Sequence, residues 1–157
     1  MPDSIGQLSN LKTFTLCFSR VFKGLPDAFS QCSKMETIYM GSNDEMDSLP
    51  SGLGNLKQLK GLDVRDAPLA REGAAGLPAD LAQLGQSENF KDFTALNQPV
   101  AWDAADQKTI ADMCSGGAKY YHGIETFEDR AKYWKRDNDK LKADAEKAES
   151  SEGEQSA

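Results

Sequence analysis

The apolar residues in the first half of the chain return every 24 positions. Each unit begins at a proline, Pro2, Pro26 or Pro50, and later contains a short stretch in which apolar and polar residues alternate. Four apolar columns recur in phase: Leu8, Cys32, Leu56; Leu11, Met35, Leu59; Phe14, Ile38, Leu62; and Leu16, Met40, Val64. A fixed period of this length is typical of proteins built from stacked repeats.

The alternation predicts one short strand in each repeat, because successive side chains of a strand point to opposite faces. We expect three parallel strands centred on Phe14, Ile38 and Leu62, with one continuous core against their inner face. The prolines turn the chain onto the outer side of the stack, where no backbone donor is needed for a sheet. Each return segment is expected to send one apolar residue into the core: Ile5, Phe29 and Leu53.

Each repeat has the pattern L-P-x-x-φ-x-x-(L/C)-x-x-φ-x-x-φ-x-φ, and segments 2–8 and 49–56 carry it most clearly. This pattern resembles the leucine-rich repeat family in its LPxxIGxLxxLxxLxLxxN variant, which is typical of plant-type intracellular repeat proteins. The family asparagine falls on Asn43, whereas Ser19 and Ala67 occupy its other two places. The resemblance covers residues 1–85. It implies an α/β fold, a short right-handed leucine-rich-repeat solenoid with parallel strands.

Residues 86–123 are predicted to form a C-terminal helical cap. A fourth repeat starts at Leu77, 28 residues after the third, but no strand motif is expected to follow it. The first expected cap helix carries Phe90, Phe93 and Leu96. The second begins near Asp103 and carries Ile110, Met113 and Cys114, with Trp102 placed against the last repeat.

Residues 124–149 are predicted to form a charged amphipathic helix, followed by a disordered tail at 150–157. Apolar residues recur there at alternating spacings of 4 and 3, including Trp134, and a lone Asn138 lies in the seam. Two interpretations remain open for this helix. It is either a solvated helix docked by its first two turns, or a helix that engages a partner.

The net charge of −7 is concentrated in the second half of the chain. Residues 1–76 hold 8 Lys/Arg against 9 Asp/Glu, and residues 77–157 hold 10 against 16. An acidic chain without a basic stripe argues against nucleic acid as the main partner, although ordinary solubility explains the charge equally well. No apolar run has transmembrane length, so no membrane insertion is expected. Three cysteines without paired spacing favour a reduced, intracellular and soluble setting, cytoplasmic or organellar.

The sequence holds few candidates for chemistry, and we expect no enzyme activity, no cofactor and no metal. Asp44, Glu45 and Asp47 form an acidic group whose spacing fits no known metal loop, so a solvated loop is favoured. Tyr120 and His122 are more consistent with cap packing than with acid–base catalysis, because no nucleophile or second base lies beside them in sequence.

The outward positions of the strands are the expected partner-binding surface. Counted in the 24-residue register, the candidate partner-binding residues are Thr15, Tyr39, Asp63, Arg65, Cys17 and Phe18, together with Trp134 of the later helix. An exposed tyrosine beside an arginine is common in protein interfaces. Phe18, Val21 and Phe22 form an apolar group whose interpretation stays open between burial under the loop and an exposed docking patch.

Two functions follow from this surface. The first is a non-catalytic protein–protein interaction module that binds a partner through its strand face. The alternative is a structural accessory subunit of a larger assembly, docked through its open N-terminal repeat and the C-terminal helix. The first repeat begins in register without a polar cap, so we expect either further repeats upstream or a neighbouring chain.

Overall fold

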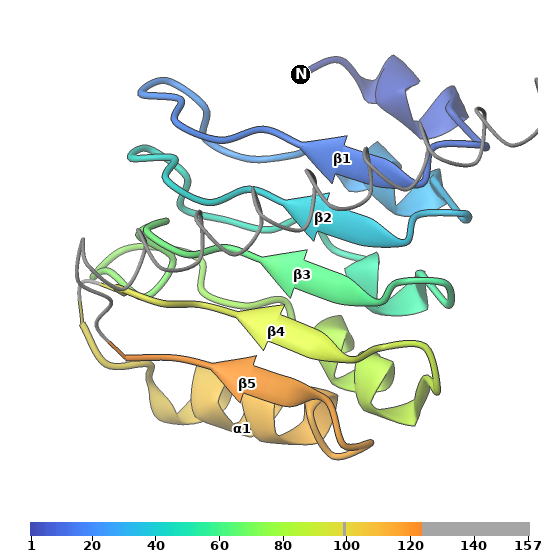
Figure 1. The fold of residues 1–157 in the computed structure, drawn as a ribbon. Helices are drawn as coiled ribbons and strands as arrows, with labels where there is room; N and C mark the ends of the chain where they lie inside the picture. The colour runs from blue at the N-terminus through green and yellow to red at the C-terminus, as the bar shows by residue number, and fades with distance from the viewer. Residues whose placement is uncertain (99, 124–157) are drawn as a thin grey trace, which may run out of the picture. The chain divides into compact units, whose positions relative to one another are not determined.

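Five short parallel strands form one sheet and follow one another in chain order, as Figure 1 shows. The computed structural model describes residues 1–98 and 100–123, which lie in one unit, Met1–Ile124. The strands are β1 (Thr13–Thr15), β2 (Thr37–Tyr39), β3 (Gly61–Asp63), β4 (Asp92–Thr94) and β5 (Lys119–Tyr121). The expected helix at 124–149, with Trp134, and the expected tail at 150–157 lie outside the described residues.

The three predicted strands are confirmed in position, direction and register. Phe14 pairs with Ile38, and Ile38 pairs with Leu62, so the 24-residue period of the sequence becomes the pairing register of the sheet. The same inward column continues into the next two strands, at Phe93 and Tyr120. This continuity makes one core that runs along the whole sheet.

Short helical turns alternate with the strands and carry the chain back to the start of the next strand. Four of them are 3-10 helices: η1 (Asp3–Gln7), η2 (Asp27–Gln31), η3 (Leu53–Asn55) and η4 (Ala79–Gln86). Pro2, Pro26 and Pro78 precede three of these turns, and Pro2 and Pro26 are extended, which suits the fixed φ of proline. The core lies between these turns and the sheet (Figure 1), and the predicted inward residues Phe29 and Leu53 are fully buried in it.

The expected helical cap at 86–123 is only partly helical. The helix predicted around Phe90, Phe93 and Leu96 is wrong, because Asp92–Thr94 is strand β4 of a fourth repeat. The second helix is confirmed as α1 (Ala104–Met113), and the Asp103 side chain caps it by accepting the Asp106 N–H at 2.8 Å. Strand β5 then pairs with β4, so the sheet continues beyond the four recognisable repeat starts.

Burial increases sharply from the first repeat to the second. Leu8 keeps 48% of its surface exposed, whereas Cys32 and Leu56, its equivalents in the next two repeats, keep 0% and 1%. Cys32 is therefore the buried apolar residue that its place in the repeat predicts. Ile5, Leu11 and Phe14 are only partly buried, although they pack against the same core. The first repeat thus leaves an apolar side of the stack incompletely covered.

Buried amide side chains tie successive repeats together on the side where the strands end. Asn43 is fully buried, and its Nδ2 donates to the carbonyl oxygens of Leu16, at 2.7 Å, and Met40, at 2.8 Å. Its Oδ1 accepts the Ser19 N–H at 3.0 Å. In the third repeat the equivalent residue is Ala67, which has no side-chain amide. In the fourth repeat it is Gln98, whose Nε2 donates to the Val64 carbonyl oxygen at 3.3 Å.

Candidate protein-interaction surface

The outward residues of the strands form rows that cross the sheet. One predicted row is confirmed in register as Thr15, Tyr39 and Asp63, and the structure extends it to Thr94 and Tyr121. Tyr39 and Tyr121 keep 45% and 41% of their surface exposed. A tyrosine held on a rigid strand presents a large amphipathic ring at low entropic cost, which is why this residue is enriched at protein interfaces.

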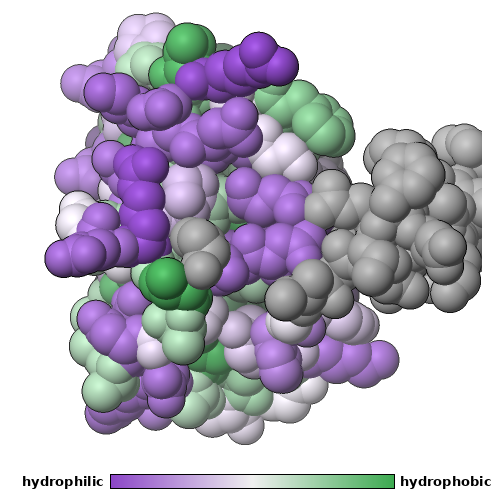
Figure 2. Space-filling view, turned by 90° about the vertical axis from the view of Figure 1, so that its left-hand side faces the viewer, coloured by the Kyte–Doolittle hydropathy of each residue, from purple (hydrophilic) through white to green (hydrophobic). Residues whose placement is uncertain are grey.

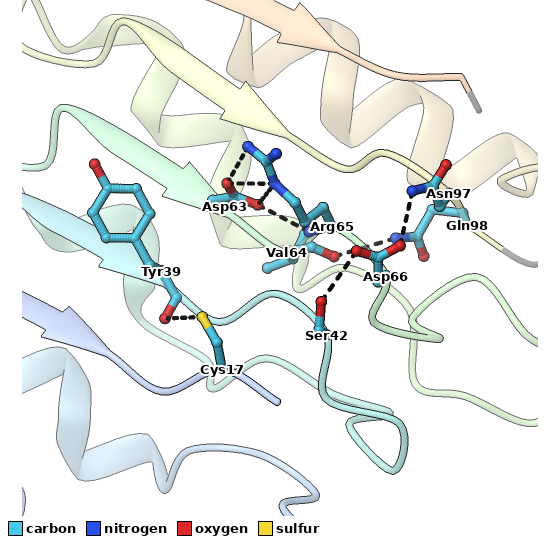
Figure 3. Close-up of polar contacts among 9 residues, drawn as sticks. All are labelled: Cys17, Tyr39, Ser42, Asp63, Val64, Arg65, Asp66, Asn97 and Gln98. Carbon is cyan, nitrogen blue, oxygen red and sulfur yellow. Dashed lines mark hydrogen bonds and ion pairs between the residues drawn. The ribbon is translucent and has the colours of Figure 1, made fainter. Parts of the chain in front are cut away.

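Asp63 and Arg65 form an ion pair between the two tyrosines of this row, as Figure 3 shows for Asp63, Arg65 and Tyr39. The Arg65 guanidinium reaches the Asp63 carboxylate through Nε, at 2.8 Å, and Nη2, at 2.7 Å. The same carboxylate accepts the Arg65 backbone N–H at 3.0 Å. The planar fork of Arg65 is therefore held in one orientation, and its charge is locally balanced.

Cys17 lies beside this pair, and its surroundings favour the protonated thiol over the thiolate. Its Sγ donates to the Tyr39 carbonyl oxygen at 3.8 Å. Burial raises the pKa of the Cys17 thiol, and the negative charge of Asp63 raises this pKa further, against the opposing effects of Gly41 and Arg65. Because the thiolate is the reactive form, this environment lowers the reactivity of Cys17.

A column of left-handed residues follows the strands and turns the chain out of the sheet. Phe18, Ser42, Asp66 and Asn97 have φ of 60°, 58°, 56° and 58°. The polar members are linked across repeats: Ser42 Oγ donates to Asp66 Oδ2 at 3.1 Å, and Asn97 Nδ2 donates to Asp66 Oδ1 at 2.8 Å (Figure 3). Asp and Asn tolerate this conformation, whereas a bulky aromatic residue is an outlier there.

Phe18 is the outlier, and it is exposed. It keeps 74% of its surface exposed and Val21 keeps 83%, whereas Phe22 packs against the core. Ser19 Oγ accepts the N–H groups of Val21 and Phe22, which closes the turn between the two phenylalanines. The two interpretations of this apolar group thus divide between its members: Phe22 anchors the loop, while Phe18 and Val21 face outward.

The side of the molecule that carries the loops after the strands is largely polar. Figure 2 shows this side, where hydrophobic atoms form small patches separated by hydrophilic ones. The exposed large apolar residues of this loop region are Phe18 and Val21, from one short stretch, and Val100, from the loop after β4.

The other candidates for chemistry take structural places in the described chain. Tyr120 stacks between Phe93 and His122, with ring centroids at 5.5 Å and 4.7 Å, and its hydroxyl accepts the Trp102 indole N–H at 3.0 Å. Burial raises the pKa of Tyr120, which keeps its hydroxyl protonated. Asp47 forms an ion pair with Arg71 at 3.6 Å. Within residues 1–98 and 100–123, no group of three His, Cys, Asp or Glu residues could hold a metal ion.

Sequence reasoning missed three residues of this surface. Tyr121 and Asn97 escaped because the strand motifs of the fourth and fifth repeats follow spacings of 31 and 27 residues, so the 24-residue register does not reach them. The signal for β4 is present as Phe90-x-x-Phe93-x-Ala95, the same spacing as Leu59-x-x-Leu62-x-Val64. Lys119, on the same face, was missed for the same reason.

No helix in the part of the chain that the structure describes is long and apolar enough to cross a membrane. No protein-family model matches the sequence, and no curated protein matches it significantly. The parallel sheet and its regular alternation with helical turns are compatible with a repeat architecture.

Proposed function

We propose that this chain is a leucine-rich-repeat protein, a right-handed solenoid that binds a protein partner through its strand face and has no catalytic role. The observation that carries the proposal is the pair of exposed aromatic residues, Phe18 and Tyr39, held on adjacent repeats of a firmly packed sheet. The core beneath Tyr39 contains fully buried residues such as Ile38 and Met40, so the backbone that presents this ring is rigid. A rigid surface binds without a large ordering cost.

The strain at Phe18 supports the same interpretation. A bulky residue in the left-handed region costs on the order of 1–2 kcal/mol, and a ring that is 74% exposed recovers little of this through packing. Strained residues of this kind concentrate at binding sites. The proposed contact surface is therefore the strand face around Thr15, Tyr39, Asp63 and Arg65, with Cys17 and Phe18 at its margin.

The test is capture of the partner from an extract of the native source by the full chain, followed by an affinity measurement with the isolated partner. Tyr39→Ala is expected to weaken binding by about 1–2 kcal/mol, roughly 5- to 30-fold, as loss of an interface anchor does. The unfolding midpoint should stay close to that of the wild type, because Tyr39 is half exposed.

Gln31→Ala is the matched control, since Gln31 is exposed on the return segment η2 and lies away from the strand face. This variant should bind like the wild type. If the triple variant Tyr39→Ala, Asp63→Ala, Arg65→Ala keeps full affinity, the interface lies elsewhere and the proposal fails.

A second function, a structural accessory subunit of a larger assembly, is favoured by the incompletely covered first repeat. Leu8 is 48% exposed, and Ile5, Leu11 and Phe14 are only partly buried. Hydrogen exchange separates the two functions. Rapid exchange in residues 1–20 of the isolated chain, with strong protection in the native complex, would favour the accessory subunit. Strong protection in the isolated monomer would favour the recognition module.

A further inference from the structure

Lysine residues of the described chain gather along the edge of the sheet where the strands begin. This basic edge comprises segments 10–13, 33–37, 57–61, 88–92 and 116–119. They contain six lysines against three acidic residues: Lys12, Lys34, Lys57, Lys60, Lys91 and Lys119 against Glu36, Glu88 and Asp92. The other described residues hold five Lys/Arg against twelve Asp/Glu. An acidic molecule thus carries one edge with a net charge of +3.

The backbone places the lysines of neighbouring strands side by side. The Lys60 N–H donates to the Glu36 oxygen at 2.7 Å, the Lys91 N–H to the Lys60 oxygen at 2.8 Å, and the Lys119 N–H to the Lys91 oxygen at 2.8 Å. Neighbouring strands lie about 4.8 Å apart. The lysines at the starts of three consecutive strands therefore lie close together at one edge of the sheet.

Only one part of the basic edge is balanced by an internal partner. Glu36 bridges Lys12, at 3.1 Å, and Lys60, at 2.6 Å, and hydrogen bonds from these two lysines lower the pKa of Glu36. Among the residues that the structure describes, the ammonium groups of Lys91 and Lys119 make no ion pair or hydrogen bond. Both side chains are exposed. Lys91 and Lys119 are therefore not neutralised by a direct contact, although Glu88 and Asp92 lie in the same segment as Lys91.

We propose that the basic edge binds an acidic segment of the protein partner, a run of Asp and Glu residues that lies across the starts of β3, β4 and β5. This inference rests on the proposed function and adds the chemistry of the partner. Complementary charges at the rim of an interface mainly raise the association rate and select among partners. An acidic peptide fits this edge better than a nucleic acid does. The basic edge offers no exposed aromatic ring on which bases could stack, because its one aromatic residue, Phe90, is buried.

The probe is a fluorescein-labelled peptide of alternating Glu and Gly, titrated with the full chain and followed by fluorescence anisotropy at about 10–50 mM salt, where screening is weak. The wild type should bind this peptide and not its Gln–Gly counterpart. The variant Lys91→Glu with Lys119→Glu should bind at least about tenfold more weakly, because it reverses two exposed charges at the proposed contact.

The matched control is Lys23→Glu with Lys108→Glu, which changes the net charge equally at exposed positions outside the basic edge. It should weaken peptide binding by less than about twofold. The inference is overturned if the wild type does not bind the acidic peptide, if both double variants lose affinity equally, or if a single-stranded oligonucleotide of equal charge binds more tightly than the peptide.

Failure of this inference can be told apart from failure of the proposed function. If the captured partner is lost with Tyr39→Ala but retained with Lys91→Glu and Lys119→Glu, the strand face binds the partner and the acidic-segment inference is wrong. If the partner is retained with both sets of variants, the strand-face proposal itself is wrong.

Discussion

The 24-residue repeats of the N-terminal half and the irregular segment after Leu77 build the same sheet from different sequence periods. The strand centres Phe14, Ile38 and Leu62 are 24 residues apart, whereas Phe93 follows after 31 residues and Tyr120 after another 27. The pairing register is nevertheless continuous through all five strands. The inward column and the backbone pairing therefore stay constant from repeat to repeat, whereas the length of the return segment varies.

The two regions differ in the length and type of the return segments, which run on the outer side of the stack. η3 has three residues, whereas η4 has eight, and α1 replaces the 3-10 turn before β5. α1 packs against η4 and contributes Ile110 and Met113 to the core. Surface segments absorb extra residues because water satisfies their backbone groups, whereas an extra residue within a strand would move every following side chain to the other face.

The largest expected effect tests whether the two regions share one core. Leu62→Asp in the regular region and Phe93→Asp in the irregular one each bury an unpaired charge at a site with 1% or 0% exposure. Both should cost more than about 4–5 kcal/mol and abolish the cooperative unfolding transition seen by circular dichroism. A Phe93→Asp variant that keeps a cooperative transition with partial amplitude would show that the irregular region folds separately.

The next effect compares the side-chain amide of Asn43, in the regular region, with that of Gln98, at the equivalent place in the irregular one. Asn43→Ala should destabilise by roughly 2–4 kcal/mol, because it leaves buried oxygen and nitrogen atoms unpaired at about 1–3 kcal/mol each. Gln98→Ala should cost only about 1 kcal/mol, since Gln98 is half-buried and its two hydrogen bonds are longer, at 3.3 Å. Urea denaturation gives both values.

Asn10→Ala is the control for this pair, because Asn10 is exposed and accepts a hydrogen bond from the exposed Lys34. It should change stability by less than about 0.5 kcal/mol. Equal losses for Asn43→Ala and Gln98→Ala would mean that the two amides are equivalent.

A smaller effect concerns the carboxylate that joins α1 to the fourth repeat. Asp106 is buried and accepts the Leu77 N–H at 2.8 Å, while burial raises its pKa. A raised folded-state pKa gives stability that is present below the ordinary pKa of Asp and is lost as pH rises through the folded value. Asp106→Asn keeps an acceptor oxygen without the charge. The free energy of unfolding of this variant, relative to that of the wild type, should therefore increase with pH in this window.

Asp106→Ala is the matched variant, and it removes the acceptor as well as the charge. At pH 7 it should lower stability by about 1–2 kcal/mol through the unpaired Leu77 N–H. Thermal unfolding between pH 3 and pH 7 gives the comparison. An Asn variant as unstable as the Ala variant would show that hydrogen bonding to Leu77 does not determine the effect.

The smallest effect concerns the exposed ion-pair ladder formed by Lys12, Glu36 and Lys60 at the start of the regular strands. Hydrogen bonds from Lys60 and Lys12 lower the pKa of Glu36, so the ladder stabilises the fold above the ordinary Glu pKa and weakens as pH falls through the lowered value. Lys60→Met should raise the Glu36 pKa toward its ordinary range, measured by carboxyl NMR titration. Lys23→Met should leave it unchanged, and an equal shift in both variants would reflect net charge alone.

The sequence was sufficient to predict what depends on local periodicity. The 24-residue columns predicted β1, β2 and β3, their register, the buried place of Cys32 and the inward turn residues Phe29 and Leu53. Helix α1 was predicted from Asp103 and the spacing of Ile110 and Met113. The strands and the helix follow from side-chain alternation and helix capping, which are properties of neighbouring residues, and the register follows from the constant 24-residue period.

Only the tertiary structure decided which residues of distant segments lie together. Phe90, Phe93 and Leu96 have a spacing that also suits a helix, and only pairing with β3 makes Asp92–Thr94 a strand. The exchange of Asn43 for Gln98 and the gathering of six lysines at one edge have the same origin, since neither forms a pattern at a constant spacing. Parallel pairing joins residues 24 to 31 positions apart, and a return segment of variable length hides that proximity in the linear sequence.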